Sequence, residues 1–471
     1  MSVQLQAPRQ HEWLSLVPIA AGLYWLFAGD GGAWLLWALL PGALLLSSGL
    51  ALALMPGDPR ILGLIAGGGA LGALLFPFAW YAADLATAFY ALLGSLSSLL
   101  AAGRLGLRFE PLYEGAQPPQ IGSSMDLKAG LDEALLGYFV CTARVPSGRD
   151  AERMCGDARQ LEAHYRAHGW DADPARMHAA PPPPDEVFAE SRRLWGIDYE
   201  NLRFDSGFQL PAELPGAARW ADYEANRSCH VRVLRHRGRR RPWLLCLHGY
   251  RMGVPWLDLS LFSPGWLHHR LGFNLVLPVL PLHGPRSPGW RSGDRFLDGD
   301  LLDLVYAQMQ ALWDLRRTLA WLRAQEDEPR IGVLGFSLGG YNAALLAGFE
   351  RRLDFVVAGI PVIDFAAALW RFLPPMHLRY LVSQGLDEAA YRHLLSPVSP
   401  LSFAPLPERR QLHVFAAAGD RIVLPSHPLA LGRHWDVPVC WYQGSHLSVR
   451  RERTTREVVQ QAVERAGWTV E

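Results

Sequence analysis

The chain has 471 residues, more than one ordinary domain requires, and half of them are hydrophobic. Lysine plus arginine equals aspartate plus glutamate, so the formal net charge is zero and lacks the basic excess typical of nucleic-acid-binding proteins. The five cysteines are scattered without a C-x-x-C spacing, which argues against a disulfide framework and against a zinc site. We therefore expect more than one structural region, with no nucleic-acid partner and no metal.

The first hundred residues are almost free of charge and predict a transmembrane region. Four apolar runs follow one another, at 13–28, 33–55, 61–81 and 85–102. A membrane-crossing helix needs about 20 apolar residues, so the second and third runs are long enough and the other two are borderline. A soluble bundle of buried helices is the alternative, but none of the runs has a polar face. We predict about four transmembrane helices within residues 1–108.

The arginines around these runs predict an orientation. Arg9 precedes the first run, Arg60 separates the second from the third, and Arg104 and Arg108 follow the fourth. With four crossings all of them lie on one side, so the positive-inside rule predicts a multi-pass protein of the inner or plasma membrane whose C-terminal part is cytoplasmic. If one borderline run does not cross, the parity changes and the C-terminal part is expected to face outward.

Residues 109–200 are more polar and predict a helical connector between the membrane region and the rest of the chain. The segments 125–141 and 150–168 have the pattern of amphipathic helices. Four consecutive prolines, Pro181 to Pro184, predict a stiff extended spacer. We expect the hinge between the membrane region and the C-terminal part to lie at this spacer.

Residues 201–471 alternate apolar strands with helices, which predicts a mostly parallel sheet covered by helices. The expected strands are 201–208, 229–234, 243–247, 273–280, 331–336, 355–360, 411–416 and 437–442. A long helix is expected at 301–323. In such sheets ligands bind at the carboxyl ends of the strands, and the polar motifs of this chain lie at those ends.

The segment Gly335-Phe336-Ser337-Leu338-Gly339 matches the G-x-S-x-G nucleophile elbow, between a predicted strand and a predicted helix. Such a turn holds the serine in strained backbone geometry and leaves no room for Cβ atoms at the flanking positions. A glycine-rich turn with an inert serine is the alternative interpretation.

With Asp420 and His446 each following a later strand, the order serine, aspartate, histidine resembles the α/β-hydrolase superfamily from about Arg237 onward. The resemblance implies an α/β-hydrolase domain and says nothing of the N-terminal part. With the apolar runs, the predicted fold is an α/β-hydrolase domain preceded by an all-α transmembrane region. The resemblance also implies a triad in which His446 takes the proton of Ser337 and Asp420 orients the imidazole. Asp364 is an alternative acid that could equally cap a helix, and His283, His427 and His434 are alternative bases.

The same resemblance places the two oxyanion donors on the backbone N–H groups of Leu338 and Tyr250. His248 and Gly249, just before Tyr250, could contact substrate, although bracing this loop is the favoured role for His248. Arg286 could hold a substrate carboxylate or phosphate. An equally good interpretation is that Arg286 pins its own loop to Asp294 or Asp298. The apolar insertion at 364–406 could form a lid over the cleft or a plain packing helix.

These observations together predict a membrane-anchored serine hydrolase that cleaves a carboxylic ester through an acyl-enzyme, without metal or organic cofactor. The expected partners are a small-molecule ester and membrane lipids, and the location near a bilayer favours a lipidic ester. A serine peptidase or thioesterase is an alternative, since fold does not fix function. Another is a catalytically inactive scaffold or binding protein with a hydrolase fold. The sequence sets no oligomeric state.

Overall fold

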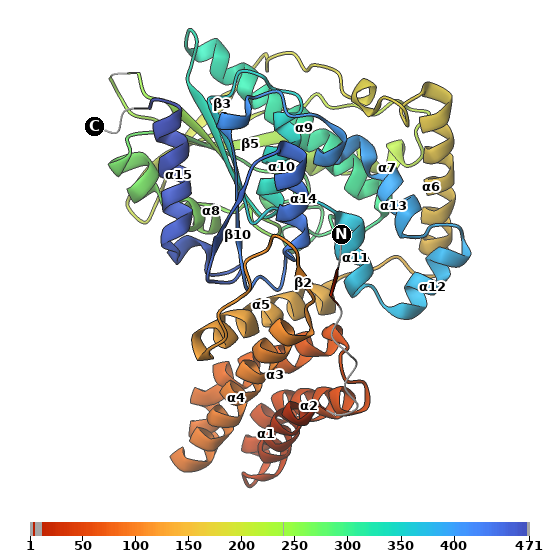
Figure 1. The fold of residues 1–471 in the computed structure, drawn as a ribbon, viewed down its shortest axis with the longest axis vertical. Helices are drawn as coiled ribbons and strands as arrows, with labels where there is room; N and C mark the ends of the chain where they lie inside the picture. The colour runs from red at the N-terminus through yellow and green to blue at the C-terminus, as the bar shows by residue number, and fades with distance from the viewer. Residues whose placement is uncertain (1–2, 5–11, 239, 469–471) are drawn as a thin grey trace. The chain divides into compact units, whose positions relative to one another are not determined.

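A computed structural model describes residues 3–4, 12–238 and 240–468 of the chain (Figure 1). The chain divides into two compact units. The smaller unit comprises Met1–Thr142, Ala416–Ser426 and Trp441–Thr454. The larger unit comprises Ala143–Phe415, His427–Cys440 and Thr455–Glu471. The division therefore falls at residue 142, inside the predicted connector, and two C-terminal segments join the N-terminal helices.

Among the described residues of the smaller unit, five α-helices form its main part, coloured red to orange in Figure 1. They are α1 (Leu16–Phe27), α2 (Gly32–Leu54), α3 (Pro59–Ala82), α4 (Leu85–Phe109) and α5 (Ser123–Thr142). Short strands β1 (Val3–Gln4) and β2 (Leu112–Tyr113) pair in an antiparallel arrangement. The predicted helix at 125–141 is confirmed as α5.

Three helices of the described chain, α2, α3 and α4, are long and apolar enough to cross a membrane. The fourth predicted run, a borderline case in the sequence, is therefore a 25-residue helix of sufficient length. The first run forms only the 12-residue α1 after a short 3-10 turn. Many large apolar side chains of this region are exposed, among them Phe27, Leu36, Leu54, Leu74 and Tyr81. Exposed apolar surface on long helices is what a lipid environment would cover.

Small residues allow the helices of the smaller unit to pack closely, as is common between membrane helices. A Cβ atom added at Gly69 would lie 2.6 Å from the carbonyl oxygen of Ser95. The buried Trp25 indole donates to the Ser95 hydroxyl at 2.8 Å. Glycines also bring α5 against α3, where an added Cβ at Gly63 would lie 2.9 Å from Cα of Gly137. The position of α5 is therefore set by backbone-to-backbone contact with the apolar helices.

The sheet of nine strands has the order β11-β10-β9-β8-β6-β7-β5-β4-β3. The strands are β3 (Phe188–Leu194), β4 (Ile197–Asp205), β5 (Ser228–Leu234), β6 (Trp243–Leu247), β7 (Asn274–Pro278), β8 (Ile331–Phe336), β9 (Phe355–Gly359), β10 (Leu412–Ala417) and β11 (Val439–Tyr442). Strands β7, β6, β8, β9 and β10 pair in parallel, whereas β3, β4, β5 and β7 pair antiparallel. The central strands β6 to β9 are fully buried, as strands covered on both faces should be.

Helices cover both faces of this sheet, with α8 and α15 on one face and α9 and α10 on the other (Figure 1). The helices of this part are α6 (Arg149–His168), α7 (Ala217–Ala221), α8 (Pro255–Phe262), α9 (Leu301–Gln325), α10 (Leu338–Ala347), α11 (Phe365–Phe372), α12 (Pro375–Ser383), α13 (Glu388–Leu394), α14 (Ser426–Trp435) and α15 (Arg453–Arg465). The central strand β8 leads through a tight turn into α10. The predicted α/β-hydrolase fold is confirmed.

The proline-rich segment does not lie at the boundary between the two units, so the predicted hinge there is wrong. It belongs to the larger unit and is held by α9. Arg316 donates to the carbonyl oxygen of Ala179 at 3.0 Å, and Arg317 donates to that of Pro183 at 3.2 Å. An extended proline segment offers unpaired carbonyl oxygens, and here the arginines of a neighbouring helix use them.

Candidate active site

Ser337 lies between β8 and α10 with φ 57° and ψ −115°, a backbone conformation that few residues other than glycine adopt. The flanking glycines are required by space. A Cβ atom at Gly335 would overlap the carbonyl oxygen of Gly339, and one at Gly339 would overlap that of Leu247. The Ser337 N–H donates to the carbonyl oxygen of Gly359 at 2.9 Å, which ties the turn to β9. The strained turn of a nucleophile elbow is therefore present.

The Ser337 side chain is half-buried and does not cap the helix that follows it. Leu338 is the first residue of α10. Its N–H is therefore among the first four of the helix, which have no acceptor inside the helix. This is the arrangement that an oxyanion donor needs, and the role of Leu338 stays a prediction.

His248 braces the loop after β6 and is not placed to bind a substrate. Its side chain is fully buried. Nε2 accepts the N–H of Leu280 at 3.1 Å, so the proton is on Nδ1, which donates to the carbonyl oxygen of Gly249 at 2.8 Å. Burial lowers the pKa of His248 to about 4, which keeps the ring neutral. The bracing role that the sequence favoured is confirmed, and the substrate-binding role is not.

The braced loop passes close to the elbow. A Cβ atom built on Gly249 would lie 3.7 Å from Cβ of Ser337. The ring of Tyr250, which is half-buried, packs edge-on against His283 with 5.8 Å between the ring centres. The loop that carries the second predicted oxyanion donor is thus beside the nucleophile, while the donor role of Tyr250 stays a prediction.

Arg286 is a structural residue, so its predicted contact with a substrate is wrong. The guanidinium is fully buried. It donates to the carbonyl oxygens of Val279 at 2.9 Å and Asn226 at 3.0 Å, and it pairs with Asp314 at 2.7 Å. The alternative interpretation, an arginine that pins its own loop, holds. Its carboxylate partner comes from α9, although the sequence had suggested Asp294 or Asp298.

The alternative acid and bases have structural partners in the larger unit. Asp364 caps α11 and pairs with Arg392 at 2.8 Å. His427 Nδ1 accepts two backbone N–H groups, each at 3.1 Å. The rings of His434 and His283 lie 2.8 and 2.9 Å from backbone carbonyl oxygens. Their surroundings explain these residues without a catalytic role, which leaves Asp420 and His446 as the favoured pair.

The structure brings Asp420 and His446 together within the smaller unit. Nδ1 of His446 lies 2.8 Å from Oδ2 of Asp420. The other oxygen of Asp420 accepts the N–H groups of Ile422 at 2.9 Å and Val423 at 2.7 Å, so its acceptor role is fully used. Burial lowers the pKa of His446, but the carboxylates of Asp420 and Asp132 outweigh it and raise that pKa above 6.5. The pair therefore has the geometry of an imidazole that is oriented by an aspartate.

Asp132, on α5, is a residue of this site that the sequence did not reveal. The side chain is fully buried. Its carboxylate accepts the N–H groups of His446 at 2.8 Å and Leu447 at 3.1 Å, and the hydroxyl of Ser445 at 2.9 Å. It also accepts the N–H of Arg421 at 3.2 Å. The only signal in the sequence was a pair of acidic residues, Asp132 and Glu133, on an otherwise apolar stretch of helix.

Arg421, directly after Asp420, is also fully buried, and its guanidinium pairs with two carboxylates. Its Nε donates to Glu133 of α5 at 2.8 Å, and its Nη1 pairs with Glu110, which ends α4, at 3.0 Å. A buried guanidinium needs such partners, because an unpaired charge inside a protein costs several kcal/mol. The loop that carries the acid is therefore fastened to α5, like the loop that carries the base, and in addition to the end of α4.

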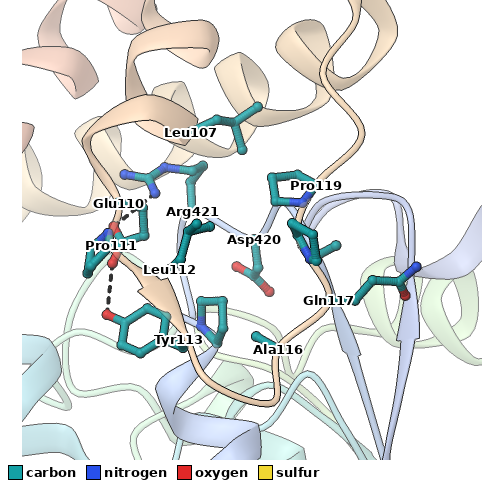
Figure 2. Close-up of a pocket in the computed structure, with 13 residues that line it drawn as sticks. Leu107, Glu110, Pro111, Leu112, Tyr113, Ala116, Gln117, Pro119, Asp420 and Arg421 are labelled. Carbon is teal, nitrogen blue, oxygen red and sulfur yellow. Dashed lines mark hydrogen bonds and ion pairs between the residues drawn. The ribbon is translucent and has the colours of Figure 1, made fainter. Parts of the chain in front are cut away.

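A cavity of about 140 Å³ lies against the acid (Figure 2). Figure 2 shows the Asp420 carboxylate among residues of the segment that follows α4. The lining residues are mostly apolar: Leu107, Glu110, Pro111, Leu112, Tyr113, Ala116, Gln117, Pro118, Pro119, Ala418, Asp420, Arg421 and Pro425. No group of three or more His, Cys, Asp or Glu side chains suited to a metal ion occurs among residues 3–4, 12–238 and 240–468.

No protein-family model matches the sequence. In structure, the chain is similar to acetyl xylan esterase 1 from Thermoanaerobacterium sp. JW/SL YS485, with 15% identity, a TM-score of 0.40, and coverage of 69% of this chain and 96% of that one. It is also similar to an acetyl xylan esterase from Paenibacillus sp. R4, with 16% identity, a TM-score of 0.42, and coverage of 69% and 98%. At these TM-scores the similarities carry no conclusion about activity.

In sequence, the chain is similar to two proteins of Mycobacterium tuberculosis. They are uncharacterized protein MT2702 of strain CDC 1551 / Oshkosh and uncharacterized protein Rv2627c of strain H37Rv. Each is 36% identical over 365 residues, which is 75% of this chain and 87% of the relative. The protein thus has an α/β-hydrolase fold with an N-terminal region of apolar helices, and it belongs to the family of these two mycobacterial proteins.

Proposed function

We propose that this protein is a serine hydrolase that cleaves a carboxylic ester, with Ser337 as nucleophile, His446 as base and Asp420 as the acid that orients the base. The observation that carries the proposal is the 2.8 Å contact between Nδ1 of His446 and Asp420. An aspartate that accepts the Nδ1 proton leaves Nε2 as the acceptor, which is the state that a general base must have. The strained turn at Ser337 supports the same assignment.

In the proposed reaction, Nε2 of His446 takes the hydroxyl proton of Ser337 while the oxygen attacks the ester carbonyl. The backbone N–H groups of Leu338 and Tyr250 stabilise the oxyanion that forms. The imidazolium then gives its proton to the leaving alcohol, and the acyl group stays on Ser337. Water, activated by the same imidazole, releases the acid and restores the enzyme.

We also propose that the apolar helices anchor the protein in a membrane, which favours a lipidic or otherwise hydrophobic ester. If α2, α3 and α4 cross and α1 does not, Arg60, Arg104 and Arg108 stay on the side of the chain that follows α4. The positive-inside rule then again favours a cytoplasmic catalytic part. The reversal expected from a change of parity does not follow in this case, because only Arg9 changes sides.

The test is to react the purified full-length protein, in detergent, with a fluorophosphonate probe and to locate the adduct by peptide mass spectrometry. We expect one adduct, on the peptide that contains Ser337, and none after heat denaturation. Absence of the adduct from the native protein, or an adduct on another serine, would contradict the proposed nucleophile and favour a catalytically inactive scaffold. Matched ester, thioester and peptide substrates then separate an esterase from a thioesterase or a peptidase.

A further inference from the structure

The loops that carry the acid and the base share one buried anchor. Asp132 accepts hydrogen bonds from the backbone on both sides, from Arg421 next to the acid and from His446 and Leu447 in the base loop. The Asp132 side chain is fully buried, with an exposed fraction of 0%. A buried carboxylate with several donors fixes the groups that bind it, because leaving any of them unpaired is costly.

Asp132 lies on α5, which packs tightly against α4. Where α5 crosses α4, a Cβ atom at Gly130 would overlap the carbonyl oxygen of Leu99, and one at Gly103 would overlap that of Asp126. Backbones in such close contact cannot slide without a clash. Asp132 lies half a turn from Gly130 on the same helix, so the apolar helices of the smaller unit determine where its carboxylate stands.

The charge of Asp132 also acts on the base. Burial, and after it the charge of Asp420, raise the pKa of Asp132, while the charge of His446 and the backbone N–H groups of Leu447 and His446 oppose this rise. In return, Asp132 is one of the two carboxylates that raise the pKa of His446. The imidazole and the two carboxylates therefore form one electrostatic cluster.

The other charged and titratable groups around this cluster have partners of their own. Arg421 is paired with Glu133 and Glu110. Lys128 of α5 pairs with Glu452 at 2.8 Å. The hydroxyl of Tyr442 donates to the carbonyl oxygen of Ser445 at 3.1 Å, and burial raises its pKa, so it stays neutral. Asp132 is thus the carboxylate besides Asp420 whose removal is expected to change the charge felt by His446.

We propose that Asp132 is a positioning residue of the reaction, which holds the histidine loop in register with Asp420 and sets a second carboxylate beside the imidazolium that forms in the transition state. This inference rests on the proposed hydrolase function. In this proposal α5, which packs against the apolar helices, positions the acid and the base of the reaction. The N-terminal region then has a role in catalysis besides anchoring the protein.

The test compares Asp132→Asn with Asp126→Asn in the full-length protein. Asp126 is a matched control, because it is a buried acid on the same helix whose partner is Arg104, at 2.6 Å. The rate constant of fluorophosphonate labelling is measured from pH 5 to 9. For Asp132→Asn we expect a loss of about 10²-fold, the typical cost of a misplaced catalytic group. We expect Asp126→Asn to stay within a few-fold of the wild type.

The pH profile distinguishes positioning from a purely structural role. Labelling of the wild type should fall as the pH falls through the pKa of His446, because the protonated imidazole cannot act as a base. Removing the Asp132 charge lowers that pKa, so the acid limb of the Asp132→Asn profile should move to lower pH. The Asp126→Asn profile should not move.

Two results would overturn the proposal. One is a wild-type rate and profile in Asp132→Asn. The other is equal losses in both variants with unmoved profiles and parallel falls in Tm, which would show a structural role alone. If Asp132→Asn does not fold, Ser445→Ala removes one donor to the same carboxylate. A loss of about 2- to 10-fold in the labelling rate is then expected for one hydrogen bond, and an unchanged rate contradicts the proposal.

The same data separate this inference from the proposed function. If the wild type is labelled at Ser337 while Asp132→Asn behaves as the wild type, only the positioning role fails. If the wild type is not labelled at all, the hydrolase assignment fails and the positioning role fails with it.

Discussion

Substituting alanine for Ser337 is expected to lower kcat for an activated ester by about 10⁶-fold, the loss seen when the nucleophile of a serine triad is removed. The hydroxyl supplies the covalent step, and nothing else in the elbow can replace it. The fold should persist, because alanine meets the same backbone strain at φ 57° that serine already accepts. Turnover of a p-nitrophenyl ester, with Tm beside it, measures both quantities.

A serine outside the elbow provides the control for this substitution. Ser402 is exposed at the end of a short 3-10 turn, so Ser402→Ala should retain wild-type turnover. Turnover by Ser337→Ala within tenfold of the wild type would contradict the nucleophile assignment. If turnover fell equally in Ser337→Ala and Ser402→Ala, the cause would be the protein preparation and not the loss of the Ser337 hydroxyl.

Substituting asparagine for Asp420 is expected to lower kcat by about 10⁴-fold, as in other triads that lose the orienting acid in this way. An asparagine can present its amide N–H₂ to Nδ1 of His446, which moves the imidazole proton to Nε2. The nitrogen that should accept the serine proton is then already protonated. The acid limb of its pH profile should also move to lower pH, because Asp420 is the largest of the charges that raise the pKa of His446.

Asp364→Asn is the matched control, since Asp364 was the alternative acid. Its carboxylate caps α11, and asparagine caps a helix about as well as aspartate, so the variant should keep wild-type stability to within about 1 kcal/mol and turnover within a few-fold. If Asp364→Asn lost 10³-fold or more while Asp420→Asn stayed active, the identity of the acid would be reversed.

The fold was largely predictable because its central strands are buried and therefore apolar, and because the turn at Ser337 requires glycine on both sides. Strands β6 to β10 are short apolar runs, and the glycines beside Ser337 stand where a Cβ atom would overlap a carbonyl oxygen. Strand β3 was missed because its sequence, FAESRRL, is almost wholly exposed and has no apolar alternation. It pairs with β4 at the edge of the sheet, where burial does not select the residues.

The pairing of Asp420 with His446 was predictable from their positions after two strands. The buried anchor behind them was not, because Asp132 meets Ser445 and His446 across more than 300 residues of sequence. The helical periodicity of a sequence shows which residues share one face of a helix, but it does not show which distant segment packs against that face. For the same reason pinning remained one of two equal interpretations of Arg286, and its partner Asp314 on α9 was not predicted.

The central proposal is that Ser337 and His446 act as one catalytic group. A double-variant measurement tests it most directly: kcat for one ester in Ser337→Ala, in His446→Ala and in the protein that carries both. Residues that act as a unit lose about as much singly as together. We expect the double variant to be no slower than either single variant. Losses that multiply would show that the two side chains act independently, and would contradict the triad.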